Sequence, residues 1–76
     1  MNLIDDRIEI ARERYGSFKS SQEALGVIAE EYQELIEAIR ANDIELVFKE
    51  ALDLAACAKK LAQDCGNREF RKRSRK

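Results

Sequence analysis

The sequence predicts an all-α protein of three helices in which the two long helices form a hairpin. The 76 residues include no proline and three glycines, and alanine, leucine, isoleucine, glutamate, lysine and arginine dominate, as in helical proteins. Apolar residues recur at alternating spacings of three and four, which is the period of an amphipathic helix. A chain of this length forms one small domain with a modest core.

The first predicted helix begins after Asn2, whose side chain can cap it, and ends at Gly16. Asp5 and Asp6 fall in its first turn, where the helix dipole favours acidic side chains. Its arginines face away from the apolar stripe, and we expect them to contact solvent, with one reaching a phosphate as the alternative. The apolar stripe consists of Ile4, Ile8, Ala11 and Tyr15.

The second predicted helix follows a short loop and begins at a capping box formed by Ser20 and Glu23. Its apolar positions keep a strict three-four rhythm, which predicts a buried stripe. Glu31 and Glu34 lie beside this stripe, so they border the predicted core. The stripe consists of Leu25, Ile28, Tyr32, Leu35 and Ile39.

The third predicted helix begins at a second capping box, from Asn42 to Glu45, and ends at Gly66-Asn67. Glu50 and Asp53 lie in a row that flanks its apolar stripe. The stripe consists of Ile44, Val47, Ala51, Leu54, Ala58, Leu61 and Cys65, and the flanking row of Leu46, Glu50, Asp53 and Cys57.

Two long helices and a short third cannot cover these stripes completely. We therefore expect a homodimer, or a higher homo-oligomer, in which two hairpins form a four-helix-bundle core. Residues 1–66 form the predicted domain and residues 67–76 a basic tail. The tail holds six of the fourteen basic residues and one of the fifteen acids, which leaves the domain with a net charge of −6. Such a tail contacts nucleic acid or nucleotide phosphates, or only improves solubility.

Several classes of site and location are excluded by composition. Without histidine, a Cys/His zinc site and a serine or cysteine nucleophile with a histidine base are not expected. Cys57 and Cys65 lie about 12 Å apart along one helix, too far for a disulfide, and we expect both in the core. No apolar run approaches the roughly eighteen residues of a membrane span, and no secretory signal is evident, so a cytoplasmic location is expected.

Two acidic pairs, Glu31 with Glu34 and Glu50 with Asp53, carry the functional interpretation. Residues three apart lie on the same side of a helix, and a hairpin at Ala41–Asp43 brings the two pairs together. Carboxylates held so close repel one another unless a cation neutralises them, and Mg²⁺ prefers such oxygen ligands.

A solvated acidic helix face is the alternative interpretation of these residues. It accounts well for glutamates that have lysine or arginine three or four positions away. Between residues 20 and 39, however, there are five glutamates and no basic residue. The pattern therefore also allows a shared cation site.

The acidic segments Glu30-Glu31-Tyr32-Gln33-Glu34 and Glu50-Ala51-Leu52-Asp53 resemble the EExxE and ExxD signature of MazG-like, all-α nucleoside triphosphate pyrophosphohydrolases. Residues 14–18 and 23–28 also look like the short, phage- or prophage-borne branch of that family. The resemblance covers roughly residues 7 to 65. Many relatives continue into a fourth helix that carries phosphate- and base-binding residues, whereas a basic segment follows the third helix here.

The resemblance implies that Glu31, Glu34, Glu50 and Asp53 bind Mg²⁺, with Mn²⁺ as a substitute. It also implies cleavage of the α–β phosphate bond of a nucleoside triphosphate, giving the monophosphate and pyrophosphate, in a house-cleaning role. Metal-bound water can supply the nucleophile, so acids suffice without histidine.

Individual roles follow from the same resemblance. Glu30 is an added ligand or a water-positioning acid, and Glu30 or Glu34 takes the proton of the attacking water. Lys49, Lys59 and Lys60 are candidates for binding phosphate, with an ordinary surface position as the alternative. Phe18 or Tyr15 is a candidate for stacking a base, with a place in the core as the alternative. Two other functions stay open: a non-catalytic helical dimerisation module whose tail contacts nucleic acid, and a relative that only binds nucleotides.

Overall fold

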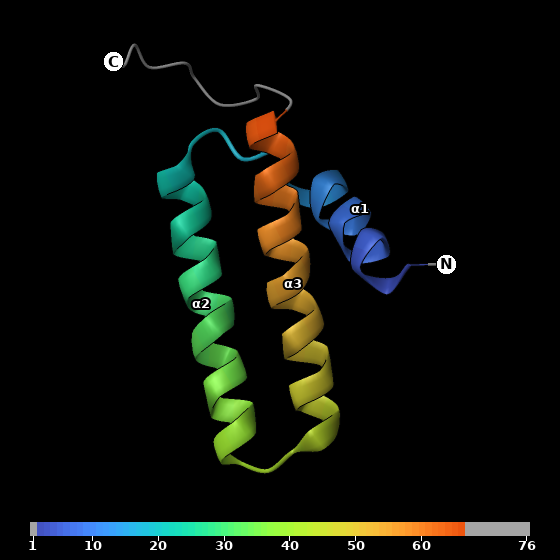
Figure 1. Cartoon of the computed structure of the whole chain (residues 1–76), viewed down its shortest axis with the longest axis vertical. Coiled ribbons are helices and arrows are strands. Elements are labelled where there is room, and N and C mark those ends of the chain that lie inside the picture. The colour runs from blue at the N-terminus through green and yellow to red at the C-terminus, as the bar shows by residue number, and fades with distance from the viewer. Residues whose placement is uncertain (1, 67–76) are drawn as a thin grey trace.

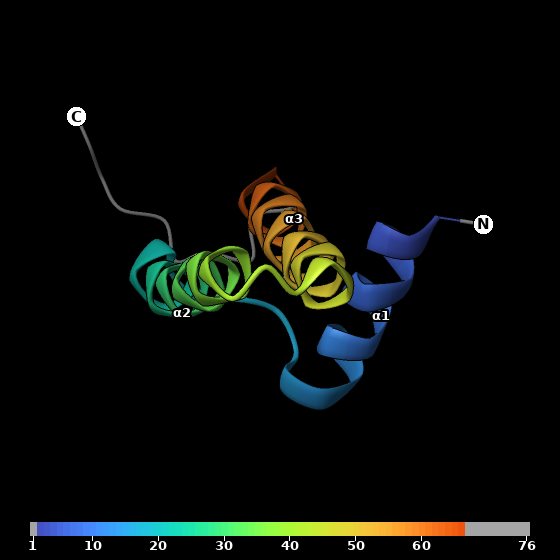
Figure 2. The same cartoon turned by 90° about the horizontal axis from the view of Figure 1, so that it is seen from below.

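The computed structural model describes residues 2–66, so the predicted basic tail lies outside the described residues. In this part the chain forms three helices and no strand: α1 (Leu3–Tyr15), α2 (Ser21–Arg40) and α3 (Ile44–Gly66). The predicted all-α class is thus confirmed. The α2 and α3 helices run antiparallel, and α1 packs against α3 on the side away from α2 (Figure 1; Figure 2). None of the helices described has the length and apolarity needed to cross a membrane.

Both ends of α1 are fixed as the sequence predicts. Asn2 Oδ1 accepts hydrogen bonds from the backbone N–H groups of Ile4 at 2.9 Å and Asp5 at 3.1 Å. At the other end, Gly16 has φ 75°, a left-handed conformation that glycine adopts without steric cost. Its N–H donates to Arg12 O at 2.9 Å, which closes the helix.

The predicted capping box of α2 forms, but the Glu23 carboxylate accepts its hydrogen bond from a different backbone N–H. Ser20 Oγ accepts from Glu23 N–H at 3.1 Å, as predicted. The Glu23 carboxylate accepts in return from Lys19 N–H at 2.7 Å, not from the N–H of Ser20. Two backbone donors at the helix start are satisfied in this way.

The turn between α2 and α3 differs from the prediction at its cap. Asn42 has φ 58°, a left-handed conformation that asparagine tolerates, and Asp43 N–H donates to Ala38 O at 3.2 Å. The residue that caps α3 is Asp43, whose Oδ1 accepts from Leu46 N–H at 3.2 Å. The prediction that Asn42 caps this helix was therefore wrong by one position.

Three of the five residues in the apolar stripe predicted to be buried on α2 are exposed. Leu25, Tyr32 and Ile39, called here the outer stripe, are 63%, 56% and 54% exposed. Ile44 at the start of α3 is 75% exposed. Within one chain, the prediction that these four positions belong to the core was therefore wrong, whereas Ile28 of the same stripe is half-buried and packs against the core.

The inward faces of the hairpin instead hold the rows that the sequence placed beside the stripes. Ala24 and Ala38 are buried on α2, and their small side chains allow α3 to approach closely. The buried residues of α3 include charged ones, and Cys57 packs with Phe18 and Ala24 in a small core. Cys65 is exposed, so it is not the core residue that we expected. The buried positions of α3 are Glu50, Ala56, Cys57, Lys60 and Asp64.

The α1 helix is joined to α3 largely by charged groups. Ile8 is its one buried residue. Two of its arginines, which we expected to contact solvent, are paired with acids of α3: Arg7 with Asp53 and Arg12 with the fully buried Asp64. These contacts place α1 along one edge of the hairpin.

Candidate functional site

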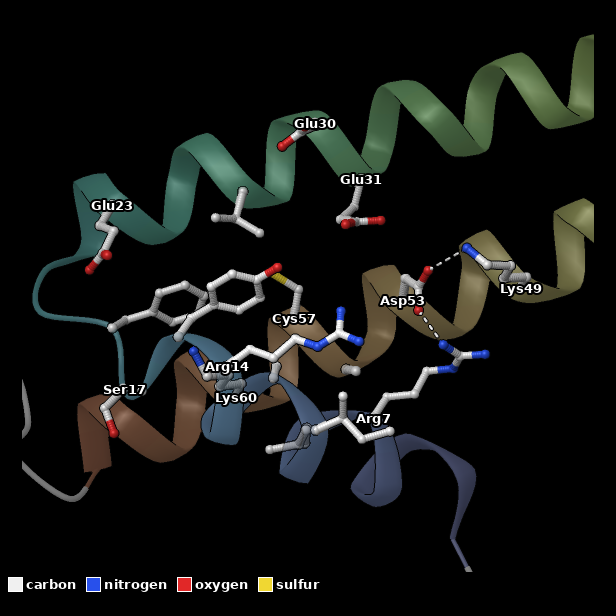
Figure 3. Close-up of a pocket in the computed structure, with 18 residues that line it drawn as sticks. Arg7, Arg14, Ser17, Glu23, Glu30, Glu31, Lys49, Asp53, Cys57 and Lys60 are labelled. Carbon is white, nitrogen blue, oxygen red and sulfur yellow. Dashed lines mark hydrogen bonds and ion pairs between the residues drawn. The ribbon is translucent and has the colours of Figure 1, made fainter.

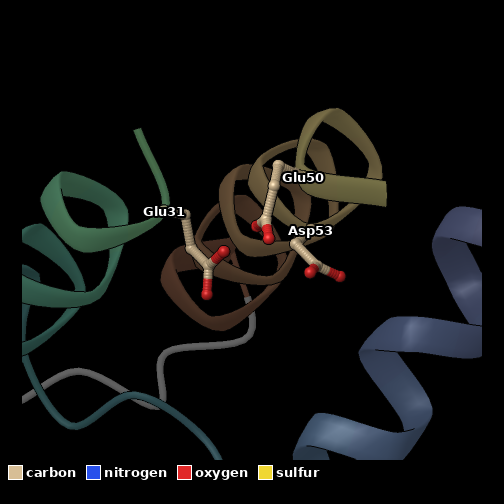
Figure 4. Close-up of side chains that lie close together, drawn as sticks. All are labelled: Glu31, Glu50 and Asp53. Carbon is tan, nitrogen blue, oxygen red and sulfur yellow. The ribbon is translucent and has the colours of Figure 1, made fainter. Parts of the chain in front are cut away.

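Three acidic side chains converge between the long helices. Glu31 comes from α2, and Glu50 and Asp53 come from successive turns of α3 (Figure 4). One carboxylate oxygen from each lies within 4.8 Å of the others, and Glu50 is buried while the other two are half-buried. The convergence follows from the three-residue spacing on α3 and from the turn that folds α3 back along α2. We call these three residues the acid cluster.

Two cations already contact the acid cluster. Arg7 Nη1 donates to Asp53 Oδ1 at 2.9 Å, and Lys49 Nζ donates to Asp53 Oδ2 at 3.3 Å. Lys49 Nζ also lies 3.6 Å from Glu50 Oε2, and its hydrogen bond to Asp53, with the charges of both acids, raises the pKa of Lys49. Both oxygens of Asp53 are therefore engaged.

Two oxygens of the acid cluster have no such partner. Glu31 Oε1 and Glu50 Oε1 are buried and accept no hydrogen bond from any of residues 2–66. A buried acceptor without a donor is unfavourable, and a buried carboxylate more so. These oxygens are the donor atoms that a hard divalent cation takes, so the residues present fit such an ion.

The electrostatic strain in the cluster is concentrated on Glu31. Removal from water, followed by the charges of Glu34, Asp53 and Glu50, raises the pKa of Glu31 from 4.5 to about 7. Partial desolvation, and then the charge of Glu50, also raises the pKa of Glu34. At neutral pH the cluster therefore favours either a proton or a cation.

The remaining predicted site residues lie around the acid cluster. Glu34 is half-buried and near enough to influence Glu31 and Glu50, but it is not one of the three whose oxygens converge. Glu30 is exposed on the rim of the adjoining pocket. Lys49 forms ion pairs with Glu50 and Asp53. Phe18 is 6% exposed and packs against Cys57 and Ala24.

A pocket of about 720 Å³ adjoins the acid cluster and is lined by all three helices and the loop after α1 (Figure 3). Glu31 and Asp53 stand at one end. Tyr15, Phe18 and Lys60 contribute to the lining, as do apolar residues such as Val27 and several cations. The cationic residues in the lining are Arg7, Arg14, Lys49 and Lys60.

The sequence interpretation missed the pairing of Arg7 with Asp53 and the burial of Asp64, and it considered Lys60 only as a candidate phosphate ligand. A signal for Lys60 and Asp64 was present, because Glu50, Asp53, Cys57, Lys60 and Asp64 continue one three-four row along α3. No comparable signal marked Arg7, which is 46 positions from Asp53.

Comparisons with protein-family models, curated proteins and solved structures found no match for this chain. The geometry and the chemistry of the residues therefore carry the functional interpretation.

Proposed function

We propose that this chain is a Mg²⁺-dependent nucleoside triphosphate pyrophosphohydrolase that produces a monophosphate and pyrophosphate. The observation that carries the proposal is the acid cluster, in which carboxylates from two helices converge within 4.8 Å and two buried oxygens accept no hydrogen bond from residues 2–66. The EExxE and ExxD resemblance supports cleavage at the α–β bond. The adjoining pocket is large enough for a small-molecule ligand.

In this proposal Glu31, Glu50 and Asp53 would hold the metal, with Glu34 beside them. A bound Mg²⁺ would screen the phosphate charges and lower the pKa of a bound water. Glu30 at the pocket rim, or Glu34, accepts the proton that the attacking water loses. Arg7 and Arg14 in the pocket lining offer positive charge to the phosphates.

We also propose that two copies of the chain pair through the outer stripe. Its members recur every seven residues along α2, and each leaves more than half of its surface exposed. Burial of this apolar area is favourable, and two hairpins packed together form a four-helix bundle. A second copy suits the stripe because its apolar rhythm is that of a helix-to-helix contact.

Pyrophosphate release tests the enzymatic proposal. The folded protein is incubated with a panel of ribo- and deoxynucleoside triphosphates, with Mg²⁺, Mn²⁺ or EDTA. Glu50→Gln is expected to abolish metal-dependent release because it removes a buried ligand charge. Glu37→Gln, an exposed position on α2 outside the pocket lining, is the matched control and is expected to retain activity.

Metal affinity is measured separately by calorimetry. Mg²⁺ binding that is lost in Glu50→Gln and kept in Glu37→Gln supports the ligand set even where turnover is slow. A folded protein that binds no Mg²⁺ and releases no pyrophosphate from any nucleotide contradicts the proposal and favours a non-catalytic module.

A further inference from the structure

Lys60 is a buried cation whose position the acid cluster does not explain. It is 4% exposed on α3, and no carboxylate of residues 2–66 lies within 4.0 Å of its Nζ. Nζ lies 3.7 Å from the centre of the Phe18 ring, and the residue lines the pocket. Burial lowers the pKa of Lys60, as expected for an ammonium removed from water.

The acid nearest to Lys60 along the helix is occupied by other groups. Asp64 Oδ2 accepts from Phe18 N–H at 2.7 Å. Its Oδ1 lies 2.7 Å from Arg12 Nη2, although the N–H of that pair is not aligned as a hydrogen bond. Lys60 thus keeps donor capacity directed at the pocket, where a ligand atom can accept from it.

The position of Lys60 along α3 relates it to the acid cluster. It follows Asp53 by seven residues, which is two helical turns or about 10 Å. Tyr15, 77% exposed, lines the same pocket, as does Phe18, whose ring lies against Lys60 Nζ. A nucleotide whose phosphates bind near the acid cluster would have room to extend its sugar and base along the pocket toward these rings.

We propose that Lys60, Tyr15 and Phe18 form a nucleobase subsite in which Lys60 Nζ donates a hydrogen bond to a carbonyl oxygen of the base. The subsite favours uracil, thymine, cytosine and guanine, each of which carries a ring carbonyl, over adenine, which carries none. This assignment deepens the proposed function and rests on it for the placement of the phosphates at the acid cluster.

A neutral carbonyl suits Lys60 because charges of both signs already surround it. Asp64, Arg12 and Glu23 act on Lys60, and Glu23 and Arg14 both line the pocket. A base carbonyl accepts a hydrogen bond from Lys60 without adding charge to this balance. The aromatic and apolar neighbours of Lys60 suit the flat face of a base.

The test measures the binding of nucleoside monophosphates by NMR titration in the presence of Mg²⁺. UMP, CMP, GMP and AMP are titrated into the wild-type protein and into Lys60→Met, which keeps the length of the side chain and removes the charge. Lys59→Met is the matched control because Lys59 points instead to Asp5, 2.7 Å from Nζ. Lys60→Arg restores the donor and shows whether the charge, rather than the packing, matters.

We expect the three carbonyl-bearing nucleotides to bind the wild type roughly 10- to 100-fold more tightly than AMP, as a charged hydrogen bond provides. Lys60→Met should lose this preference, Lys59→Met should keep it and Lys60→Arg should restore part of it. Thermal unfolding confirms that each variant is folded. If Lys60→Met is unfolded, the subsite is tested by the preference of the wild type for carbonyl-bearing nucleotides over AMP and by the change of that preference in Lys60→Arg.

The results separate this inference from the enzymatic proposal. If the protein binds bases selectively through Lys60 but releases no pyrophosphate, the subsite inference stands and the enzymatic proposal is rejected. Pyrophosphate release with no preference against adenine, or with the same preference in Lys60→Met, overturns the subsite and keeps the enzyme. Absence of monophosphate binding in the wild type also overturns the subsite.

Discussion

The guanidinium of Arg7 lies 2.9 Å from Asp53 Oδ1, so the first helix supplies a cation to the acid cluster formed by the other two. Lys49 contributes a second cation from the preceding turn of α3. Together they offset part of the repulsion among the carboxylates in the metal-free protein. A metal ion at this site would compete with both for Asp53.

Replacement of Arg7 by glutamine should have opposite effects on stability and on metal binding. The Arg7–Asp53 pair is partly exposed, so its loss should lower the free energy of unfolding by about 0.5–1 kcal/mol without metal. The more negative cluster should then bind Mg²⁺ several-fold more tightly. Urea denaturation and calorimetry measure the two effects. Weaker Mg²⁺ binding in a folded variant would show that Arg7 positions Asp53 rather than competing for it.

The stability of the metal-free protein should fall as pH rises from about 4.5 to 7. Folding raises the pKa of Glu31 from 4.5 to about 7, so in this interval the folded state holds a proton that the unfolded state has released. Glu31→Gln should flatten this dependence, and Glu37→Gln should not. Denaturation midpoints measured in EDTA across this range test it, and an equal slope in Glu31→Gln would assign the dependence to another group.

Asp64 should be the acid whose loss most destabilises the fold. Asp64→Ala leaves the Phe18 N–H without its acceptor and the Arg12 guanidinium without its paired charge, at a cost of about 2–4 kcal/mol. Asp64→Asn keeps an acceptor for Phe18 N–H and should cost less. Thermal unfolding compares the stabilities of the two variants. An Asp64→Ala variant as stable as the wild type would mean that water replaces both contacts.

Charges placed on the outer stripe should separate the proposed dimer. Leu25→Lys combined with Tyr32→Lys should cost more than about 2 kcal/mol of association energy, or roughly 30-fold in the dissociation constant. Helical content should persist because both side chains are exposed within one chain. Sedimentation equilibrium measures the change. A wild-type protein that sediments as a monomer at high concentration would reject pairing through this face.

The helices and the convergence of acids were predictable because they depend on local signals. Asn2 and Ser20 cap helices as their sequence contexts indicate, and the three-residue spacing of Glu50 and Asp53 places both on one side of α3. The turn that pairs the long helices was marked by the break near Asn42. These signals are confined to a few neighbouring residues.

The inward face of the hairpin was not predictable in the same way. The row containing Ala24, Glu31 and Ala38 has the same three-four rhythm as the outer stripe, so periodicity alone does not choose between them. Apolarity favoured the outer stripe, whereas a single chain packs its small residues inward. The contacts of α1 with α3, such as that between Arg7 and Asp53, join residues too far apart in sequence to leave a local pattern.

Because ion pairs help to attach α1, we expect the pocket that it lines to respond to ionic strength. The Debye screening length shortens from about 8 Å at physiological salt to about 3 Å at 1 M salt. Exposed ion pairs such as Lys59–Asp5 therefore weaken first. The apolar contact of Ile8 then holds α1 with less help, while the hairpin keeps its own packing. Because α1 forms one wall of the pocket, hydrogen exchange in α1 should accelerate with added salt before exchange in α2 or α3 does.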